Sequence, residues 1–135
     1  MTARLLVDEH IRVDSQVVRT YLAIDGDRVR VELEAPGGAT TGGALSAAAV
    51  VHVVRRYARP LDPEVAAQLD GAPRLELAGG VALVRLHWRA LVDADARDWL
   101  VLVAPGEEPQ AAMATGVAAA LRYLVARLAG EREPA

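Results

Sequence analysis

The residues best placed to do chemistry lie in Val84–Val92, where apolar and polar side chains alternate. This alternation is typical of a β-strand with one buried face, and positions two apart in a strand point to the same side. Arg85, His87 and Arg89 would therefore form a small cationic strip. Such a strip could bind a carboxylate or a phosphate, because guanidinium groups hold these anions through paired hydrogen bonds. The alternative is an ordinary solvent-exposed strand face.

A second group of polar side chains lies in the first predicted hairpin, Val17–Glu34. If each hairpin buries its apolar face, Arg19, Tyr21 and Arg30 share the polar side of the sheet with the cationic strip. Aromatic and guanidinium groups are enriched where proteins recognise other chains, so this combined surface is the predicted binding site. Two glutamates of the same hairpin could instead neutralise the arginines into a solvated ladder.

Two tryptophans indicate an alternative site. If the second hairpin pairs Ala90 with Trp99 and Trp88 with Val101, both indoles lie on one face. Packing in the core is the default for such residues. A pocket between the sheet and the helices, lined by Trp88 and Trp99, is the alternative.

The remaining motifs are weak. The glycine-rich segment Gly37–Gly43 could cradle a phosphate ahead of a helix, but it matches no phosphate-binding pattern and is interpreted as a flexible connection. Ser46 lacks the flanking glycines of a catalytic serine and is interpreted as a helix-packing residue. Asp93, Asp95 and Asp98 surround a turn without the glycine and glutamate of a calcium loop. The three histidines also lack metal-binding spacing. No catalytic residue, metal or cofactor is predicted.

The elements that must position these residues follow from local patterns. After the strand that contains His87 and an acidic turn, Asp98–Ala104 returns as an apolar strand, and Pro105 and Gly106 end it. A long helix is then predicted from Pro109, with a helically spaced apolar stripe. The stripe consists of Met113, Val117, Leu121, Leu124 and Leu128.

The first half follows a similar plan. A strand over Ala3–Val13 precedes the first hairpin, whose Asp25-Gly26 is predicted to form the two-residue turn that sets the register. That register places Leu22 opposite Val29. A helix is predicted over Ala44–Arg59, although the β-branched residues in 44–58 also permit a strand. The chain then continues with a short helix from Pro63 to Leu69, capped by Asp62, and a short strand from Arg74 to Leu77.

The order of elements predicts one α+β domain over residues 1–130 and a disordered tail over 131–135. We expect a two-layer structure, an antiparallel sheet with helices on one face, built from duplicated βββα units at about 3–70 and 71–130. This order, without an N-terminal helix, resembles that of secretion-chaperone-like and YbjN-like domains. The resemblance implies an α+β fold that dimerises and binds other polypeptides.

Composition narrows the function. The 135 residues are 53% hydrophobic, which is enough for a core, and the net charge of -3 favours no nucleic-acid partner. The chain contains no Lys, Asn or Phe, a bias typical of a bacterial GC-rich genome, and the missing lysine excludes a Schiff base. Neither a signal peptide nor a membrane span is predicted, so we expect a cytoplasmic location.

Together these patterns favour a non-catalytic accessory protein, chaperone-like, that holds a peptide or protein partner as a homodimer. The dimer is predicted because small side chains on the last helix permit close approach of another helix: Ala111, Ala114, Ala118 and Val125. The alternative neighbour is the predicted helix Ala44–Arg59 of the same chain. The alternative is a small enzyme or small-molecule binder. Its pocket would lie between sheet and helices and use His, Arg and carboxylate chemistry.

Overall fold

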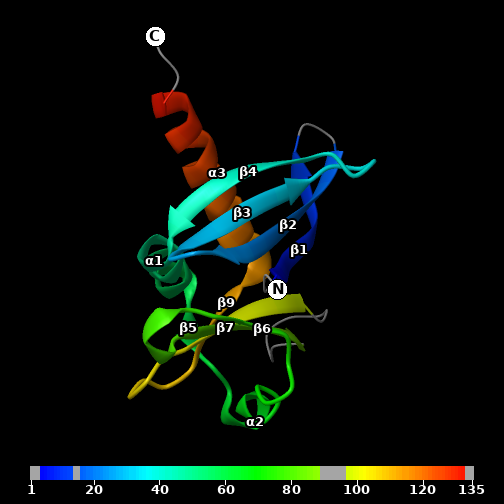
Figure 1. Ribbon diagram of the computed structural model, residues 1–135. Helices are drawn as coiled ribbons and strands as arrows, with labels where there is room; N and C mark the ends of the chain where they lie inside the picture. The colour runs from blue at the N-terminus through cyan, green and yellow to red at the C-terminus, as the bar shows by residue number, and fades with distance from the viewer. Residues whose placement is uncertain (1–3, 14–15, 89–96, 133–135) are drawn as a thin grey trace.

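The computed structural model describes residues 4–13, 16–88 and 97–132. The fold is mixed α+β, as predicted, but the strands form two antiparallel sheets rather than one (Figure 1). Sheet A has the order β1 (Arg4–Val13), β2 (Gln16–Asp25), β3 (Arg28–Glu34), β4 (Thr40–Ser46). Sheet B has the order β5 (Arg59–Pro60), β9 (Gln110–Met113), β8 (Arg97–Val103), β7 (Ala82–Trp88), β6 (Arg74–Glu76).

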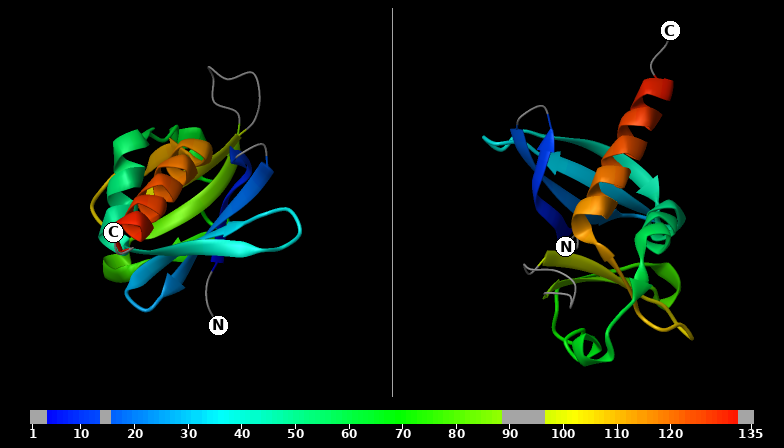
Figure 2. Two further views of the ribbon diagram at one scale, coloured as in Figure 1. Left: turned by 90° about the horizontal axis from the view of Figure 1, so that it is seen from above. Right: turned by 180° about the vertical axis from the view of Figure 1, so that it is seen from behind.

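The three α-helices differ in length and position. They are α1 (Ala47–Tyr57), α2 (Pro63–Ala66) and α3 (Ala114–Arg132), and a 3-10 turn covers Ala78–Gly80. Helix α3 crosses the inner face of sheet A, and α2 lies at the far end of sheet B (Figures 1 and 2). Among the described residues no helix is long and apolar enough to span a membrane.

The main core lies where both sheets meet α1 and α3. Leu22 and Val31 from sheet A, Leu83 and Leu100 from sheet B, and Leu121 from α3 all have at most 1% of their surface exposed. Burial of this size stabilises the fold by about 1.5–3 kcal/mol for each large aliphatic side chain. The two sheets are therefore parts of one domain.

Sheet B is buried on both faces. On the side of β7 and β8 opposite the main core, the strands pack against the chain around α2. Together they form a second apolar cluster, which includes Leu61, Leu86, Trp99 and Val101. Strands buried on both faces contain continuous apolar runs, as Leu100–Val103 does. The expectation that helices cover one face only is wrong for this sheet.

Both hairpins form, but their registers differ from the predicted ones. Asp25 pairs with Arg28, so the turn residues are Gly26 and Asp27, and Leu22 lies opposite Val31 rather than Val29. Gly26 takes the positive φ of +64° that this turn requires. Because the shift is two residues, each side chain keeps its predicted face.

Strand β4 forms where a flexible connection and the start of a helix were expected. Residues 40–43, predicted as a flexible connection, and residues 44–46, predicted as helix, pair with β3 along its whole length. Gly42 has a φ of +148°, and a Cβ there would lie 1.9 Å from the carbonyl oxygen of Val31. These glycines therefore allow a close approach between strands rather than a mobile loop.

The helices begin later than the apolar stripes predicted. Ser46, interpreted as a packing residue, is the N-cap of α1, and its hydroxyl accepts a hydrogen bond from the Ala49 N–H at 3.1 Å. Residues 110–113 form β9, so α3 starts at Ala114, and Met113 is an exposed strand residue. Helix α3 continues to Arg132 into the predicted tail. Asp62 caps α2 as predicted, with its carboxylate accepting from the Glu64 N–H.

The two halves of the chain share an order of elements. Four strands and a helix occur first as β1–β4 and α1, and again as β6–β9 and α3. Each unit thus has one more strand than the predicted βββα unit. A duplication of the chain stays a prediction, which superposition of the two halves would test.

Candidate functional site

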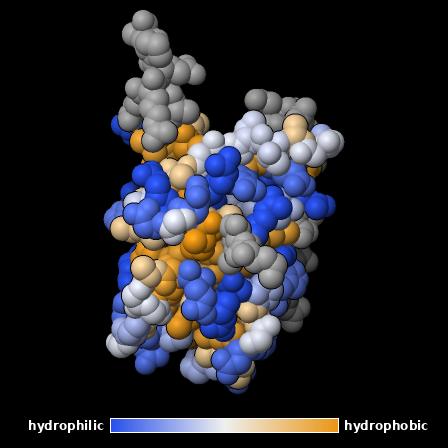
Figure 3. Space-filling model, viewed as in Figure 1, coloured by the Kyte–Doolittle hydropathy of each residue, from blue (hydrophilic) through white to orange (hydrophobic). Residues whose placement is uncertain are grey.

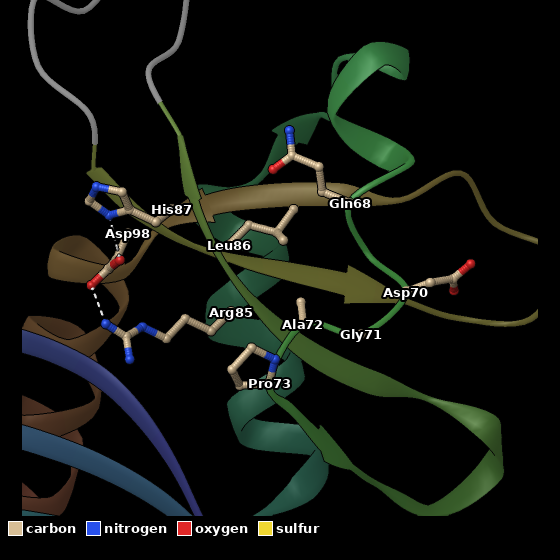
Figure 4. Close-up of a pocket in the computed structure, with 9 residues that line it drawn as sticks. All are labelled: Gln68, Asp70, Gly71, Ala72, Pro73, Arg85, Leu86, His87 and Asp98. Atoms are coloured by element: carbon tan, nitrogen blue, oxygen red, sulfur yellow. Dashed lines mark hydrogen bonds and ion pairs between the residues drawn. The ribbon is translucent and has the colours of Figure 1, made fainter.

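The residues with chemical potential in sheet B meet at Asp98. The register of β7 and β8 places His87 opposite Asp98. One carboxylate oxygen of Asp98 lies 2.9 Å from Nδ1 of His87, and the other accepts a hydrogen bond from Nη2 of Arg85, also at 2.9 Å (Figure 4). The Asp98 side chain is only 19% exposed. With both oxygens engaged and little solvent around it, the carboxylate is held in one orientation.

The position of Asp98 determines which ring nitrogen of His87 is available to a ligand. Because the Asp98 carboxylate already accepts a hydrogen bond from Arg85, we assign Nδ1 of His87 as the donor to its other oxygen. Nε2 then carries the lone pair in the neutral ring. The His87 side chain is 64% exposed, so this nitrogen can accept a hydrogen bond or a proton from a bound molecule.

A surface pocket of about 490 Å³ adjoins this cluster (Figure 4). This volume lies within the range of about 300–1,000 Å³ typical of ligand sites. The sheet contributes Arg85, Leu86, His87 and Asp98, and the chain after α2 contributes Gln68 and residues 70–73. The pocket therefore combines polar groups with an apolar wall at Leu86, which is buried.

The pocket lies where β7 loses its neighbour. Strand β6 pairs with β7 only over Arg74–Glu76, and the last hydrogen bond on this edge joins the Arg85 N–H to the Pro73 carbonyl at 2.9 Å. Gly71, at a φ of +84°, turns the preceding chain away. Backbone groups alternate in direction along a strand, so the N–H and C=O of His87 point to the same edge as the Arg85 N–H. Within the described ranges, no strand pairs with β7 there beyond Arg85.

The predicted polar surface is divided between the two sheets. Arg85 and His87 were expected on the side of the sheet opposite the helices. They instead share the face of β7 that holds Leu83 of the main core. The polar side chains of the first hairpin lie on sheet A instead. Arg89 falls outside the described residues.

On sheet A the glutamates neutralise the cations, as the alternative interpretation had it. Arg4 lies 2.8 Å from Glu32 and covers the Tyr21 ring at 3.7 Å. Arg30 lies 3.5 Å from Glu32 and is half exposed. Such exposed ion pairs contribute about 0–1 kcal/mol. Arg19 lines a separate pocket at the end of sheet A, together with Val17 and residues 34–38.

The tryptophan pair lies on the far side of sheet B from α1 and α3. Trp88 and Trp99 stack with ring centroids 4.6 Å apart, and the Trp99 indole N–H donates to the Trp88 carbonyl at 3.3 Å. The guanidinium of Arg59 lies 4.7 Å from the Trp99 ring centroid. Leu86, rather than Ala90, pairs with Trp99. Trp99 is 1% exposed, so it packs in the second apolar cluster and does not line a pocket beneath the helices.

Two features of the site have no local signal in the sequence: the role of Asp98 and the contribution of the segment after α2. Asp98 was grouped with Asp93 and Asp95, both outside the described residues, because the assumed register hid its pairing with His87. A correct register is the one feature that could have found it. Among the described residues no group of three His, Cys, Asp or Glu is placed to hold a metal.

Comparison with known proteins gives no guide to function: no protein-family model, no curated protein and no solved structure matches the chain.

Proposed function

We propose that the protein is a non-catalytic binding protein that holds an extended polypeptide segment in the pocket beside β7. One observation carries the proposal: the edge of β7 at His87, where none of the described strands pairs, adjoins a fixed group of polar side chains, Arg85, His87 and Asp98. An extended segment laid along this edge satisfies the backbone groups of His87, as in other cases of strand addition.

The two faces of β7 determine which segment fits. On one face a bound strand meets His87, whose Nε2 accepts a hydrogen bond, and Asp98. On the other face it meets Leu86 and the half-buried Ala72. Side chains of a strand alternate between its faces. The preferred segment therefore alternates a hydrogen-bond donor with a small apolar residue.

Binding is favoured over catalysis by what lines the pocket. Its nine residues include no Ser, Thr, Cys, Lys or Tyr, so no hydroxyl, thiol or amine nucleophile accompanies His87. The hydrogen bond from His87 to Asp98 does support a second candidate function, acid–base chemistry on a small molecule, since it orients a base toward solvent. Turnover of a bound ligand that stops in His87→Gln would favour this second function.

The setting of this activity is also part of the proposal. We propose a cytoplasmic protein of a bacterium with a GC-rich genome, on the basis of the amino-acid bias, and a homodimer. The small side chains that first motivated the dimer are buried within the chain, so a dimer requires another surface. Those side chains are Ala111, Ala114, Ala118 and Val125.

The test uses peptides selected against the protein from a random library. Their dissociation constants are measured by fluorescence polarisation for wild type, Asp98→Asn and Arg30→Ala. Asp98→Asn keeps the shape of the side chain but removes its charge, and we expect it to weaken binding about tenfold, or by 1.4 kcal/mol. Arg30→Ala lies on sheet A and should change binding less than about twofold. Equal binding by wild type and Asp98→Asn would refute the proposed site.

A further inference from the structure

We propose that two copies of the chain pair along the free edge of β4, forming one continuous sheet from the two copies of sheet A. This deepens the homodimer part of the proposed function and names its interface. It does not involve the pocket beside β7, which lies on sheet B, so either proposal can fail without the other.

The first observation is the length of the open edge. Strand β4 is the outer strand of sheet A and pairs with β3 at every residue from Thr40 to Ser46. Only one of its two edges is used in this way, and within the described part of the chain no strand lies on the other. Alternate residues of this seven-residue strand turn their backbone donors and acceptors to the free edge, where the Ala44 carbonyl already accepts a hydrogen bond from the Arg28 guanidinium at 3.1 Å.

The second observation is that β4 lacks the usual protection against pairing. Natural edge strands carry charged residues or proline, or they are interrupted by a bulge. The sequence of β4, Thr-Thr-Gly-Gly-Ala-Leu-Ser, has neither charge nor proline, and its register with β3 runs without a shift. One charged side chain reaches it from β3, because the Arg28 guanidinium donates to the Ala44 carbonyl at 3.1 Å. The opposite edge of sheet A differs, because β1 has register shifts and contacts sheet B.

This composition selects a second copy as the partner. In a two-fold antiparallel pair, each position faces a position of the same strand, so any charge in β4 would lie close to its own copy. Hydroxyl, methyl and glycine positions face one another without repulsion. The strand is therefore complementary to a second copy once Arg28 of each copy releases the Ala44 carbonyl.

The third observation is that α3 extends beyond the same edge. Val125 lies against Gly43 of β4, with its Cγ1 3.1 Å from where a glycine Cβ would be. The helix continues to Arg132, which adds about 10 Å at 1.5 Å per residue. Figures 1 and 2 show this end projecting past β4, and Figure 3 shows apolar surface at its base.

A second copy on β4 gives the projecting helix a surface to cover. Leu124 and Leu128 belong to the apolar stripe of α3, yet both are only half-buried. In this two-fold pair both α3 helices lie on the same side of the joined sheet, so the end of each α3 reaches the joint beside the α3 of the other copy. Both leucines then lose further contact with water, which adds a hydrophobic contribution to the backbone pairing.

The experiment measures mass by light scattering, with Thr41→Lys as the test variant and Thr115→Lys as the matched control. Thr41 is exposed on β4, and Thr115 is exposed in the first turn of α3, far from that edge. We expect a dimer for wild type and Thr115→Lys, and a dimer weakened about tenfold or more in Thr41→Lys, because two added cations meet at the joint. Hydrogen exchange of the β4 amides should slow as wild-type concentration rises.

Two results would overturn the proposal. Wild-type protein that stays monomeric at about 100 µM has no self-pairing edge, and β4 would then be open to a strand of another protein. A Thr41→Lys variant that dimerises as tightly as wild type, with unchanged exchange in β4, would place the interface elsewhere.

Discussion

Replacement of Gly42 by alanine tests whether the glycine-rich segment is a tightly packed strand. A Cβ at this position would lie 1.9 Å from the Val31 carbonyl oxygen, far inside contact distance, and the φ of +148° is one that alanine rarely adopts. The backbone conformation alone costs about 1–3 kcal/mol. Since β4 must also move away from β3, we expect a total loss of about 3 kcal/mol or more in the free energy of unfolding.

Two other glycines provide matched controls. Gly37 has a positive φ of +99° but no atom within 4 Å of a new Cβ, so Gly37→Ala should cost only about 1 kcal/mol. Gly116 lies within α3, also with open space, so Gly116→Ala should stabilise the protein by about 1 kcal/mol.

The assay is urea unfolding followed by tryptophan fluorescence, with free energies compared at equal m-values. For a domain of this size, a loss of 3 kcal/mol lowers the unfolding temperature by about 10 °C. If Gly42→Ala and Gly37→Ala unfold at the same urea concentration, the close packing of β4 on β3 is wrong.

Three further perturbations test the packing. Thr20 is fully buried and its hydroxyl has no hydrogen-bond partner among the described residues, so Thr20→Val should raise the free energy of unfolding by about 1 kcal/mol; a loss of stability would contradict this. Arg55 donates two hydrogen bonds to Glu107, at 2.5 and 2.9 Å, which hold the pKa of Glu107 below its usual value. The stability from this pair is present above the unfolded pKa of glutamate and disappears as pH falls through the lowered pKa, so urea titrations of wild type and Arg55→Ala should differ near neutral pH and converge in acid. Trp99→Phe removes the indole donor to Trp88, and calorimetry should detect a loss of about 1–2 kcal/mol, whereas an unchanged transition would contradict the packing.

Local patterns predicted the elements whose causes are local. The alternation in β2, β3 and β7, the capping residue Asp62 and the α+β class all followed from neighbouring residues. Strands β4 and β9 were not predicted, because segments rich in glycine and alanine have little apolar alternation to detect. Their pairing depends on β3 and β8, which lie elsewhere in the chain.

The division into two sheets also depends on distant contacts. Each hairpin could be recognised alone, but nothing local specifies whether β4 pairs onward to another hairpin or ends a sheet. The polar residues of the two hairpins were therefore placed on one surface, which the structure separates.

The candidate site was predicted in part. The alternation around His87 placed it beside Arg85 on one face, as observed. The partner of both, Asp98, depended on the length of the loop between β7 and β8. The expected register was wrong by four residues on β7: it paired Trp88 with Val101, whereas Val84 is the observed partner of Val101. In the expected register His87 does not lie opposite Asp98.

The most direct measurement of the central claim is hydrogen exchange at the His87 backbone amide, resolved by NMR, with and without a saturating library-selected peptide. If a segment adds to the open edge of β7, exchange at His87 should slow at least about tenfold. The amides of β3 serve as the internal reference and should stay unchanged. A peptide that binds fully while the His87 amide exchanges at its free rate would contradict strand addition at this pocket.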